Sequence, residues 1–406
     1  MTVAERPFSL RSVALAALLP TLLFSIGEGA IIPLIPLVAH DLGASLAIAG
    51  LLGALIMVGT VVGDIPSGVI VSRIGERTAM IGAALLAVVA VFVCLIAPNW
   101  WVLGIGIFVV GLATAVFGLA RHALLTSYVP LEYRARALST LGGVFRAGFF
   151  IGPFLSAAVI HFSGGTQAVF WIFIGCCLAT VVVLVLVPDP TASLQHEGAS
   201  FVRRESQSLL RTLWANRGVL VRLGTGASLI GAMRATRIVI MPLWAVSIGI
   251  GEADTALIIG LAGAIDFALF YASGQIMDRF GRVWSALPSM LGLGSGLLVL
   301  AFTHDLPSSV QWFIAVAMFL SVANGVGSGI LMTLGADLAP RDDPAPFLGA
   351  WRFSGDLGAA VAPLAVAGIT AVASLAIASG VAGVAGLVGA GLLARYIPRY
   401  IPRIKR

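Results

Sequence analysis

Charged side chains are scarce in this chain. Asp, Glu, Lys and Arg make up 10% of its 406 residues, whereas hydrophobic residues make up 59%. A soluble domain carries about 25% charged residues, so this chain has too few charges to cover the surface of a water-soluble fold of its length. Its 48 glycines and 19 prolines agree with a membrane protein, because both residues are commoner in membrane helices than in soluble ones.

Catalytic signatures are also missing. The one lysine, Lys405, lies in the tail, which excludes a Walker phosphate loop, because that loop needs a lysine within a glycine-rich turn. No His-Glu-x-x-His or Gly-x-Ser-x-Gly motif occurs, and the five histidines have no metal-ligand spacing. The three cysteines, Cys94, Cys176 and Cys177, fall in apolar segments and suit packing. We therefore expect no catalytic residue, no metal and no cofactor, and a protein that is not an enzyme.

Twelve apolar runs are long enough to span a bilayer, which takes about 20 residues. They are apolar on all faces, which favours helices over a membrane β-barrel. The first run is longer than the apolar core of a signal peptide, and we interpret it as a retained helix. The predicted spans are 12–38, 45–70, 78–97, 100–124, 137–161, 166–187, 219–247, 254–277, 284–303, 309–336, 346–371 and 373–395.

The basic residues predict the orientation in the membrane. Of the 24 arginines and lysines, 19 fall in the termini and in alternate connections, and the other connections hold none. By the positive-inside rule both termini are expected in the cytoplasm, in the inner or plasma membrane. The rule also explains the net charge of +6, so we expect the lipid bilayer and no nucleic acid as a partner. The remaining five basic residues lie inside predicted helices: Arg121, Arg146, Arg234, Arg237 and Arg352.

An internal repeat divides the chain into two halves. One offset of 206 residues relates Pro36 to Pro242, Arg73 to Arg279 and Arg146 to Arg352. We predict an N-terminal six-helix bundle over 1–187, a cytoplasmic linker over 188–217, and a C-terminal six-helix bundle with a basic tail over 218–406. The fold class is thus an all-α membrane protein with 12 transmembrane helices in two pseudo-symmetric bundles. Parallel repeats of this kind are typical of transporters that bind substrate at the repeat interface.

Two motifs carry a resemblance to a known family. Residues Gly274, Asp278, Arg279, Gly281 and Arg282 form Gly-x-x-x-Asp-Arg-x-Gly-Arg, which resembles the loop signature between helices 2 and 3 of the major facilitator superfamily. The first half keeps Gly68, Arg73 and Gly75 but has Ser72 in place of the acid and Glu76 in place of a base. The stretch Gly148-x-x-x-Gly152-Pro153 is similar to the core of that superfamily's antiporter signature.

The resemblance is closest to the 12-helix drug:proton antiporter branch. It departs from that branch at Ser156 and Ala157, where a glycine pair is usual, and at Ile107, where an arginine is usual. Glycines let helices approach closely, proline bends a helix, and loop charges can latch one conformation. We expect the following residues to act in gating and conformational change: Asp64, Gly68, Arg73, Gly75, Gly274, Asp278, Arg279, Gly281, Arg282, Arg146, Gly148, Gly152, Pro153, Arg352 and Asp356.

Ionisable groups inside the membrane are costly unless they are paired or solvated, so they mark candidate sites. The repeat relates Glu28 to position 234, so we predict that Glu28 and Arg234 face one cavity and are coupled, with Glu28 as the proton site. Arg237 and Asp266 lie at depths that differ by roughly 3 Å and are expected to pair. Arg352 and Asp356 are four residues apart and can pair along one helix face.

These residues predict a secondary transporter that works by alternating access and acts as a monomer. The first hypothesis is proton-coupled efflux of a small amphipathic or drug-like molecule. The alternative is a proton-coupled importer or facilitator of a small organic anion, which the arginines would bind. A more remote alternative is a non-transporting membrane sensor or lipid-handling protein. The candidates for lining the cavity or binding the substrate are Arg121, Arg234, Arg237, Asp266 and Asn324.

Overall fold

The computed structural model describes residues 14–129, 131–187, 214, 216–339 and 344–401, and these residues are almost entirely helical. Twelve helical segments are long and apolar enough to cross a membrane, which confirms the predicted fold class. The first six contain η1 (Ala14–Leu18), α2 (Leu19–Ile31), η2 (Ile32–Leu34), α3 (Ile35–Asp41), α4 (Leu46–Ile74), α5 (Glu76–Leu95), α6 (Trp100–Tyr128), α7 (Leu131–Ser163), η3 (Thr166–Val169) and α8 (Phe170–Leu186).

The second half repeats this order. Its segments are α10 (Arg217–Val219), η5 (Leu220–Gly224), α11 (Thr225–Ser247), α12 (Glu252–Phe280), α13 (Val283–Thr303), α14 (Ser309–Val326), α15 (Ile330–Leu338), α16 (Pro344–Val372) and α17 (Leu375–Tyr400). Most of the predicted linker over 188–217 lies outside the described residues.

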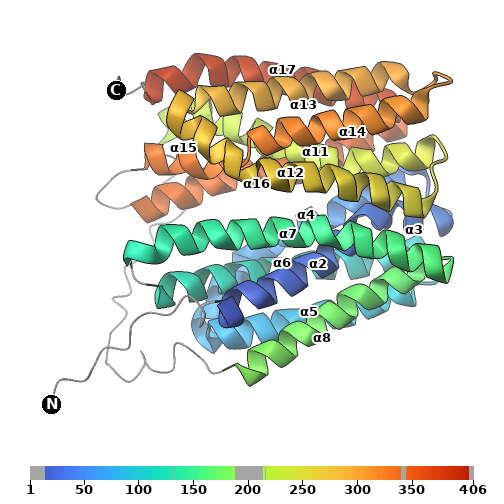
Figure 1. Ribbon diagram of the computed structural model, residues 1–406, viewed down its shortest axis with the longest axis horizontal. Helices are drawn as coiled ribbons and strands as arrows, with labels where there is room; N and C mark the ends of the chain where they lie inside the picture. The colour runs from blue at the N-terminus through green and yellow to red at the C-terminus, as the bar shows by residue number, and fades with distance from the viewer. Residues whose placement is uncertain (1–13, 130, 188–213, 215, 340–343, 402–406) are drawn as a thin grey trace.

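The helices form two bundles that lie side by side (Figure 1). The helices from α2 to α8 make one bundle, drawn from blue to green, and those from α11 to α17 make the other, drawn from yellow to red. Equivalent helices pack in equivalent pairs, since α2 packs on α7 as α11 packs on α16, and α4 packs on α6 as α12 packs on α14. Because the number of crossings is even, the start of the first crossing and the end of the last crossing lie on the same side of the molecule. We call this side the linker side and the opposite side the loop side.

The proposed antiporter motif of α7 is a site of close helix contact. A Cβ added at Gly152 would lie 2.5 Å from the backbone nitrogen of Ala30, so only glycine lets α7 approach α2 this closely. The repeat-related Gly358 of α16 meets Ser228 of α11 in the same way. Glycine therefore allows close packing of the equivalent helix pair in each bundle, α2 with α7 and α11 with α16.

Two of the crossings predicted as single helices are interrupted. The first crossing passes through the 3₁₀ turn η2, which contains Pro33, because proline has no N–H for an α-helical bond. The tenth crossing breaks at 327–329 between α14 and α15, where Gly329 has a φ of +78°. In the membrane such breaks are tolerated where they are buried in protein or line a cavity.

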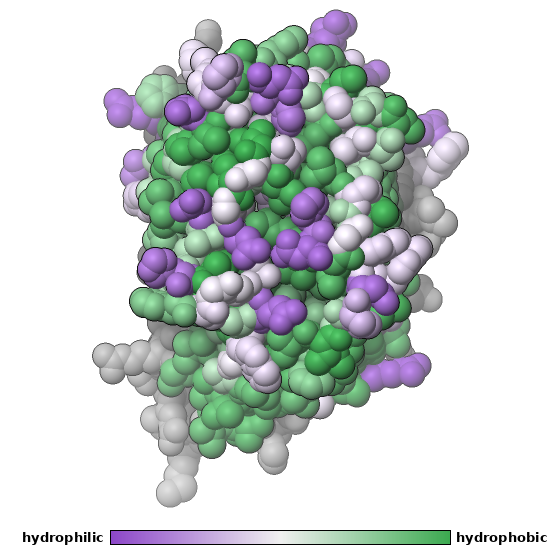
Figure 2. Space-filling model, turned by 90° about the vertical axis from the view of Figure 1, so that its right-hand side faces the viewer, coloured by the Kyte–Doolittle hydropathy of each residue, from purple (hydrophilic) through white to green (hydrophobic). Residues whose placement is uncertain are grey.

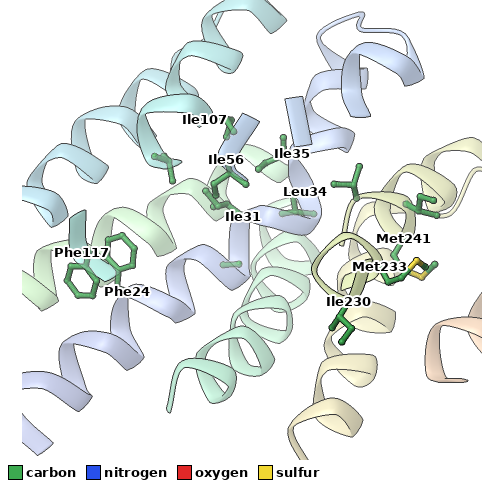
Figure 3. Packing of buried hydrophobic residues seen from close by; sticks show 14 of the residues in the cluster. Phe24, Ile31, Leu34, Ile35, Ile56, Ile107, Phe117, Ile230, Met233 and Met241 are labelled. Carbon is green, nitrogen blue, oxygen red and sulfur yellow. The ribbon is translucent and has the colours of Figure 1, made fainter. Parts of the chain in front are cut away.

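Apolar side chains fill each bundle and also cover its outside. Phe24 of α2 stacks on Phe117 of α6 with ring centroids 4.2 Å apart, and Figure 3 shows this pair together with other buried apolar residues of the core. Large apolar side chains such as Phe302 and Val185 remain 81% and 60% exposed. Such exposure suits a lipid environment and would promote aggregation in water.

The two bundles meet along α7 with α12 and along α4 with α16. Near the loop side the contact is close, because a Cβ at Gly50 would lie 3.7 Å from the Cβ of Ala367 and one at Gly260 would lie 3.1 Å from the ring of Phe154. Figure 2 looks onto this side, where side chains fill the surface between the bundles and hydrophilic residues gather along the middle.

The linker half of each interface helix carries a glycine that borders open space. A Cβ added at any of four glycines there, one on each interface helix, would meet no other heavy atom within 4 Å in the described part of the chain, namely Gly68, Gly142, Gly274 and Gly349. At these four positions the neighbouring helices do not pack closely.

Candidate functional site

Glu28 is a buried carboxylate in the N-terminal bundle. It lies in α2 with 3% of its surface exposed, and one carboxylate oxygen accepts a hydrogen bond of 2.5 Å from the Thr114 hydroxyl of α6. Arg121 acts on it electrostatically. Thr114 and Arg121 are seven residues apart, so two helical turns bring both to the same face of α6. We call Glu28, Thr114 and Arg121 the Glu28 cluster.

Arg121 connects this cluster to the other bundle. Its guanidinium lies over the ring of Phe145 in α7, 4.9 Å from the centroid, a cation–π contact that stabilises a partly desolvated charge. Arg121 also interacts electrostatically with Arg352 of α16. Both groups are positive and repel each other, and the carboxylates of Glu28 and Asp356 partly offset this repulsion.

A second set of charges spans the bundle interface toward the linker side. Arg352 and Asp356 pair at 3.3 Å along α16, as predicted, with 62% and 44% of their side chains exposed. Asp64 of α4 interacts electrostatically with both of them, and His122 of α6 with Arg352. We call Asp64, Arg352 and Asp356 the interface network. The exposure of Arg352 and Asp356 shows that this part of the interface is accessible to solvent.

Asp266 is the centre of a denser polar group in the C-terminal bundle. It accepts hydrogen bonds from Arg237 of α11 at 3.1 Å and from Asn324 of α14 at 2.6 Å. The predicted pairing of Arg237 with Asp266 is therefore confirmed. Arg237 also donates to the hydroxyl of Ser321 at 2.8 Å.

Arg146 joins the same group from the other bundle. It extends from α7, lies 3.8 Å from the second oxygen of Asp266, and donates to the hydroxyl of Ser328 in the break between α14 and α15. Its guanidinium also lies 4.7 Å from the ring centroid of Phe270. We call Arg146, Arg234, Arg237, Asp266 and Asn324 the arginine cluster.

Arg234 also belongs to the arginine cluster. It donates a hydrogen bond of 2.7 Å to the carbonyl of Gly327, and it interacts electrostatically with Arg146, Asp266 and Arg237. Glu28, in contrast, has partners on α6. Among the described residues Glu28 and Arg234 form no ion pair, so their coupling through a shared cavity stays a prediction.

The loop motifs make contacts within their own bundles. Arg282 bonds Asp337 at 2.8 Å and Asp278 at 3.2 Å, and these partners raise the pKa of its guanidinium above the ordinary value. In the first half, where the acid is missing, Arg77 instead donates to backbone carbonyls at the end of α8, including that of Val187 at 2.5 Å. The departures from the motif in the first half thus accompany a change of partner.

One glycine of each loop motif and the remaining motif arginines lie at helix ends, whereas Gly68 and Gly274 lie within α4 and α12. Gly75 and Gly281 have φ of +83° and +96°, a conformation that favours glycine, and they separate α4 from α5 and α12 from α13. Arg73 stands in the last turn of α4, and Arg279 lies 5.5 Å from the ring of Phe280.

Sequence reasoning missed Thr114, Ser328 and Phe270. The spacing of Thr114 from Arg121 would have indicated a shared face with an intramembrane charge. The Gly-Ser-Gly at 327–329 would have indicated a break in the tenth crossing. Phe270 carries no comparable signal, because aromatic residues are common in membrane helices.

Comparisons with known proteins agree with this geometry. A family model of the Major Facilitator Superfamily matches residues 17–363 and 223–406. The tetracycline resistance protein, class G, of Vibrio anguillarum is 27% identical over 342 residues, which cover 80% of this chain and 82% of that protein. The quinolone resistance protein NorA of Staphylococcus aureus is 23% identical over 47% of this chain and 48% of its own length.

A further relative and two solved structures are also similar to this chain. An uncharacterized MFS-type transporter of Mycobacterium tuberculosis is 24% identical over 39% of this chain, and the match spans only 23% of that protein's length. Among solved structures, a POT family transporter in complex with a thioalcohol-conjugated peptide superposes with a TM-score of 0.78 at 11% identity, covering 96% of this chain and 97% of its own. A D-xylose-proton symporter superposes with a TM-score of 0.72 at 16% identity, covering 98% and 100%.

These structures share the fold with the present chain, and the family match spans nearly all of it. The chain is a membrane transporter, not an enzyme, and it belongs to the Major Facilitator Superfamily.

Proposed function

We propose that this transporter exports a small amphipathic or drug-like molecule in exchange for protons. The observation that carries the proposal is Glu28, a carboxylate buried in the N-terminal bundle with a hydroxyl donor and an arginine beside it. The names of the tetracycline and quinolone resistance relatives support an efflux substrate. In this proposal the linker side is cytoplasmic, the protein resides in the inner or plasma membrane, and it acts as a monomer.

Glu28 can exchange a proton because two opposing effects act on it. Burial favours its neutral form, whereas Thr114 and Arg121 favour its charged form. A proton on Glu28 removes the negative charge that faces Arg121, so the repulsion between Arg121 and Arg352 of the other bundle is offset less. A change of protonation therefore changes the energy of bringing the bundles together on the linker side, as a coupling ion must.

The test is transport driven by a pH gradient. Tetracycline and a quinolone serve as probes in inverted vesicles, and we compare the unaltered protein with Glu28→Gln and with Asp305→Asn, whose carboxylate is 96% exposed. We expect Glu28→Gln to abolish gradient-driven accumulation while probe binding persists, and Asp305→Asn to transport normally. Undiminished accumulation in Glu28→Gln would falsify the assignment of the proton site.

The second candidate is import or facilitated movement of a small organic anion. The arginine cluster favours it, because three arginines surround one aspartate there. The direction of transport distinguishes the two candidate functions. Export predicts accumulation in inverted vesicles with an acidic interior, whereas import predicts accumulation in right-side-out vesicles with an acidic exterior.

A further inference from the structure

The arginine cluster carries an excess of positive charge. Arg146, Arg234 and Arg237 bring three guanidinium groups to one carboxylate, that of Asp266. With every arginine charged, the five side chains sum to +2. Ionisable groups at membrane depth usually occur in neutralising pairs or face an aqueous path, so two uncompensated charges at one place call for a counter-charge from elsewhere.

The hydrogen bonds identify which arginines are uncompensated. Arg237 is held by Asp266 and Ser321, at 3.1 and 2.8 Å. Arg234 has a backbone carbonyl as its partner, and its buried Nε has none among the described residues. Arg146 has a hydroxyl and lies 3.8 Å from the Asp266 Oδ1, which is itself buried without a hydrogen bond. Among the described residues, Arg146 and Arg234 thus donate hydrogen bonds only to neutral oxygens, and Asp266 is the one carboxylate near Arg146.

The break in the tenth crossing fixes where these two side chains meet. Arg234 donates to the carbonyl of Gly327 and Arg146 to the hydroxyl of Ser328, which are adjacent residues of the break. The nine-residue helix α15 begins at Ile330 directly after them, so its partial positive charge adds to that of the arginines. Half-helix ends of this kind bind the anionic groups of substrates in other transporter architectures.

We propose that Arg146 and Arg234 bind an anionic group of the transported molecule, a carboxylate, sulfonate or phosphate ester on an apolar body. The inference rests on the proposed transport function and narrows its substrate class, whichever the direction. The Arg146 side chain is 25% exposed, so the site is not sealed. The ring of Phe270 lies 4.7 Å from the Arg146 guanidinium and offers an apolar wall.

Binding at this site acts on both bundles at once. Arg146 belongs to α7 in the N-terminal bundle, and Arg234 belongs to α11 in the C-terminal bundle. An anion held between them adds an attraction across the interface that is absent when the site is empty. The substrate therefore stabilises the conformations in which the two arginines converge, which links its binding to the rocking motion.

The experiment compares acids with their uncharged amides. The purified full-length protein is titrated with each compound, and binding is measured from the shift in its melting temperature. The compounds are 1-naphthoate, 1-naphthamide, 4-phenylbutyrate and 4-phenylbutyramide. We expect each acid to bind about 10–100-fold more tightly than its amide, because hydrogen bonds to a charged group are stronger than neutral ones. Arg146→Gln and Arg234→Gln should abolish the preference, whereas Arg234→Lys, which keeps the charge, should retain most of it.

The matched control is Arg222→Gln, which removes an exposed arginine that bonds Tyr400 far from the cluster. It should leave the acid preference unchanged. The inference is overturned if no acid binds more tightly than its amide to the unaltered protein, or if the preference persists in Arg234→Gln. Gradient-driven transport in proteoliposomes is a separate measurement. Transport without acid preference refutes this inference alone, and acid preference without any transport refutes the proposed function.

Discussion

Replacing Asp266 by asparagine perturbs the arginine cluster with little change of shape. The substitution removes the negative charge that Arg237 and Arg146 approach at 3.1 and 3.8 Å, and it weakens the acceptor that Asn324 reaches at 2.6 Å. Three guanidinium groups are then left without a counter-charge inside the cluster. We expect the folded protein to be destabilised and the cluster to loosen.

The burial of the Arg237–Asp266 pair determines how much stability the substitution is expected to cost. Removing one partner of a buried ion pair costs about 3–5 kcal/mol, because the other charge stays desolvated. Arg237 and Asp266 each keep 17% of their side-chain surface exposed, so we expect a loss at the low end, about 3 kcal/mol. The control is Asp356→Asn, which breaks an i,i+4 pair whose side chains are 62% and 44% exposed. An exposed pair contributes about 0–1 kcal/mol.

A denaturant titration of the purified protein, followed by tryptophan fluorescence, measures both losses. The double variant Arg237→Gln with Asp266→Asn should be less destabilised than the sum of the single variants by about 1–3 kcal/mol, because it removes a positive charge together with the negative one. Equal losses for Asp266→Asn and Asp356→Asn, or additive losses in the double variant, would refute the reasoning that this pair is a buried and coupled unit.

Two further predictions follow from single contacts. Thr114→Val removes the hydroxyl that donates to Glu28 at 2.5 Å, and we expect slower gradient-driven transport of tetracycline with unchanged binding. Thr180→Val, which loses only a bond to its own helix, should transport normally, and equal rates in the two variants would contradict the role of Thr114. Gly152→Ala places a Cβ 2.5 Å from the backbone of α2 and should cost about 1–3 kcal/mol in the same denaturant titration. Gly175→Ala, where the Cβ meets open space among the described residues, should be neutral or stabilising; a neutral Gly152→Ala would show that α2 and α7 can separate freely.

The number of crossings was predictable because it depends on a bulk property. A helix that spans a bilayer needs about 20 apolar residues, and an apolar stretch of that length can be recognised directly in the sequence. The interruptions at η2 and at 327–329 were not predicted, since both lie within continuous apolar runs. Their causes are local, a proline and a pair of glycines, and proline and glycine are too common in this chain to mark every break.

Parts of the site were predictable for geometric reasons. The Arg352–Asp356 pair follows from helix spacing alone, and the Arg237–Asp266 pair follows from similar depth in two helices that are consecutive in the chain. The place of Arg146 in the arginine cluster did not follow. Its motif indicated gating, and its contacts depend on how α7 is rotated toward α12, which no pattern within one helix specifies.

The position of Arg146 also limits how the transporter can move. Its contacts with Asp266 and Ser328 cross from one bundle to the other, and so does the electrostatic interaction of Asp64 with Arg352 and Asp356. In the alternating-access cycle that we propose, the two bundles move relative to one another, so the contacts that cross their interface cannot all keep their lengths. In that cycle at least one of these sets would exchange partners, because leaving the charges unpaired in the membrane costs several kcal/mol. Water reaches the exposed Arg352 and Asp356, whereas a substrate anion is the partner best suited to the more buried Arg146. The few charges that this chain keeps within its helices thus lie where the conformational change must break and remake contacts.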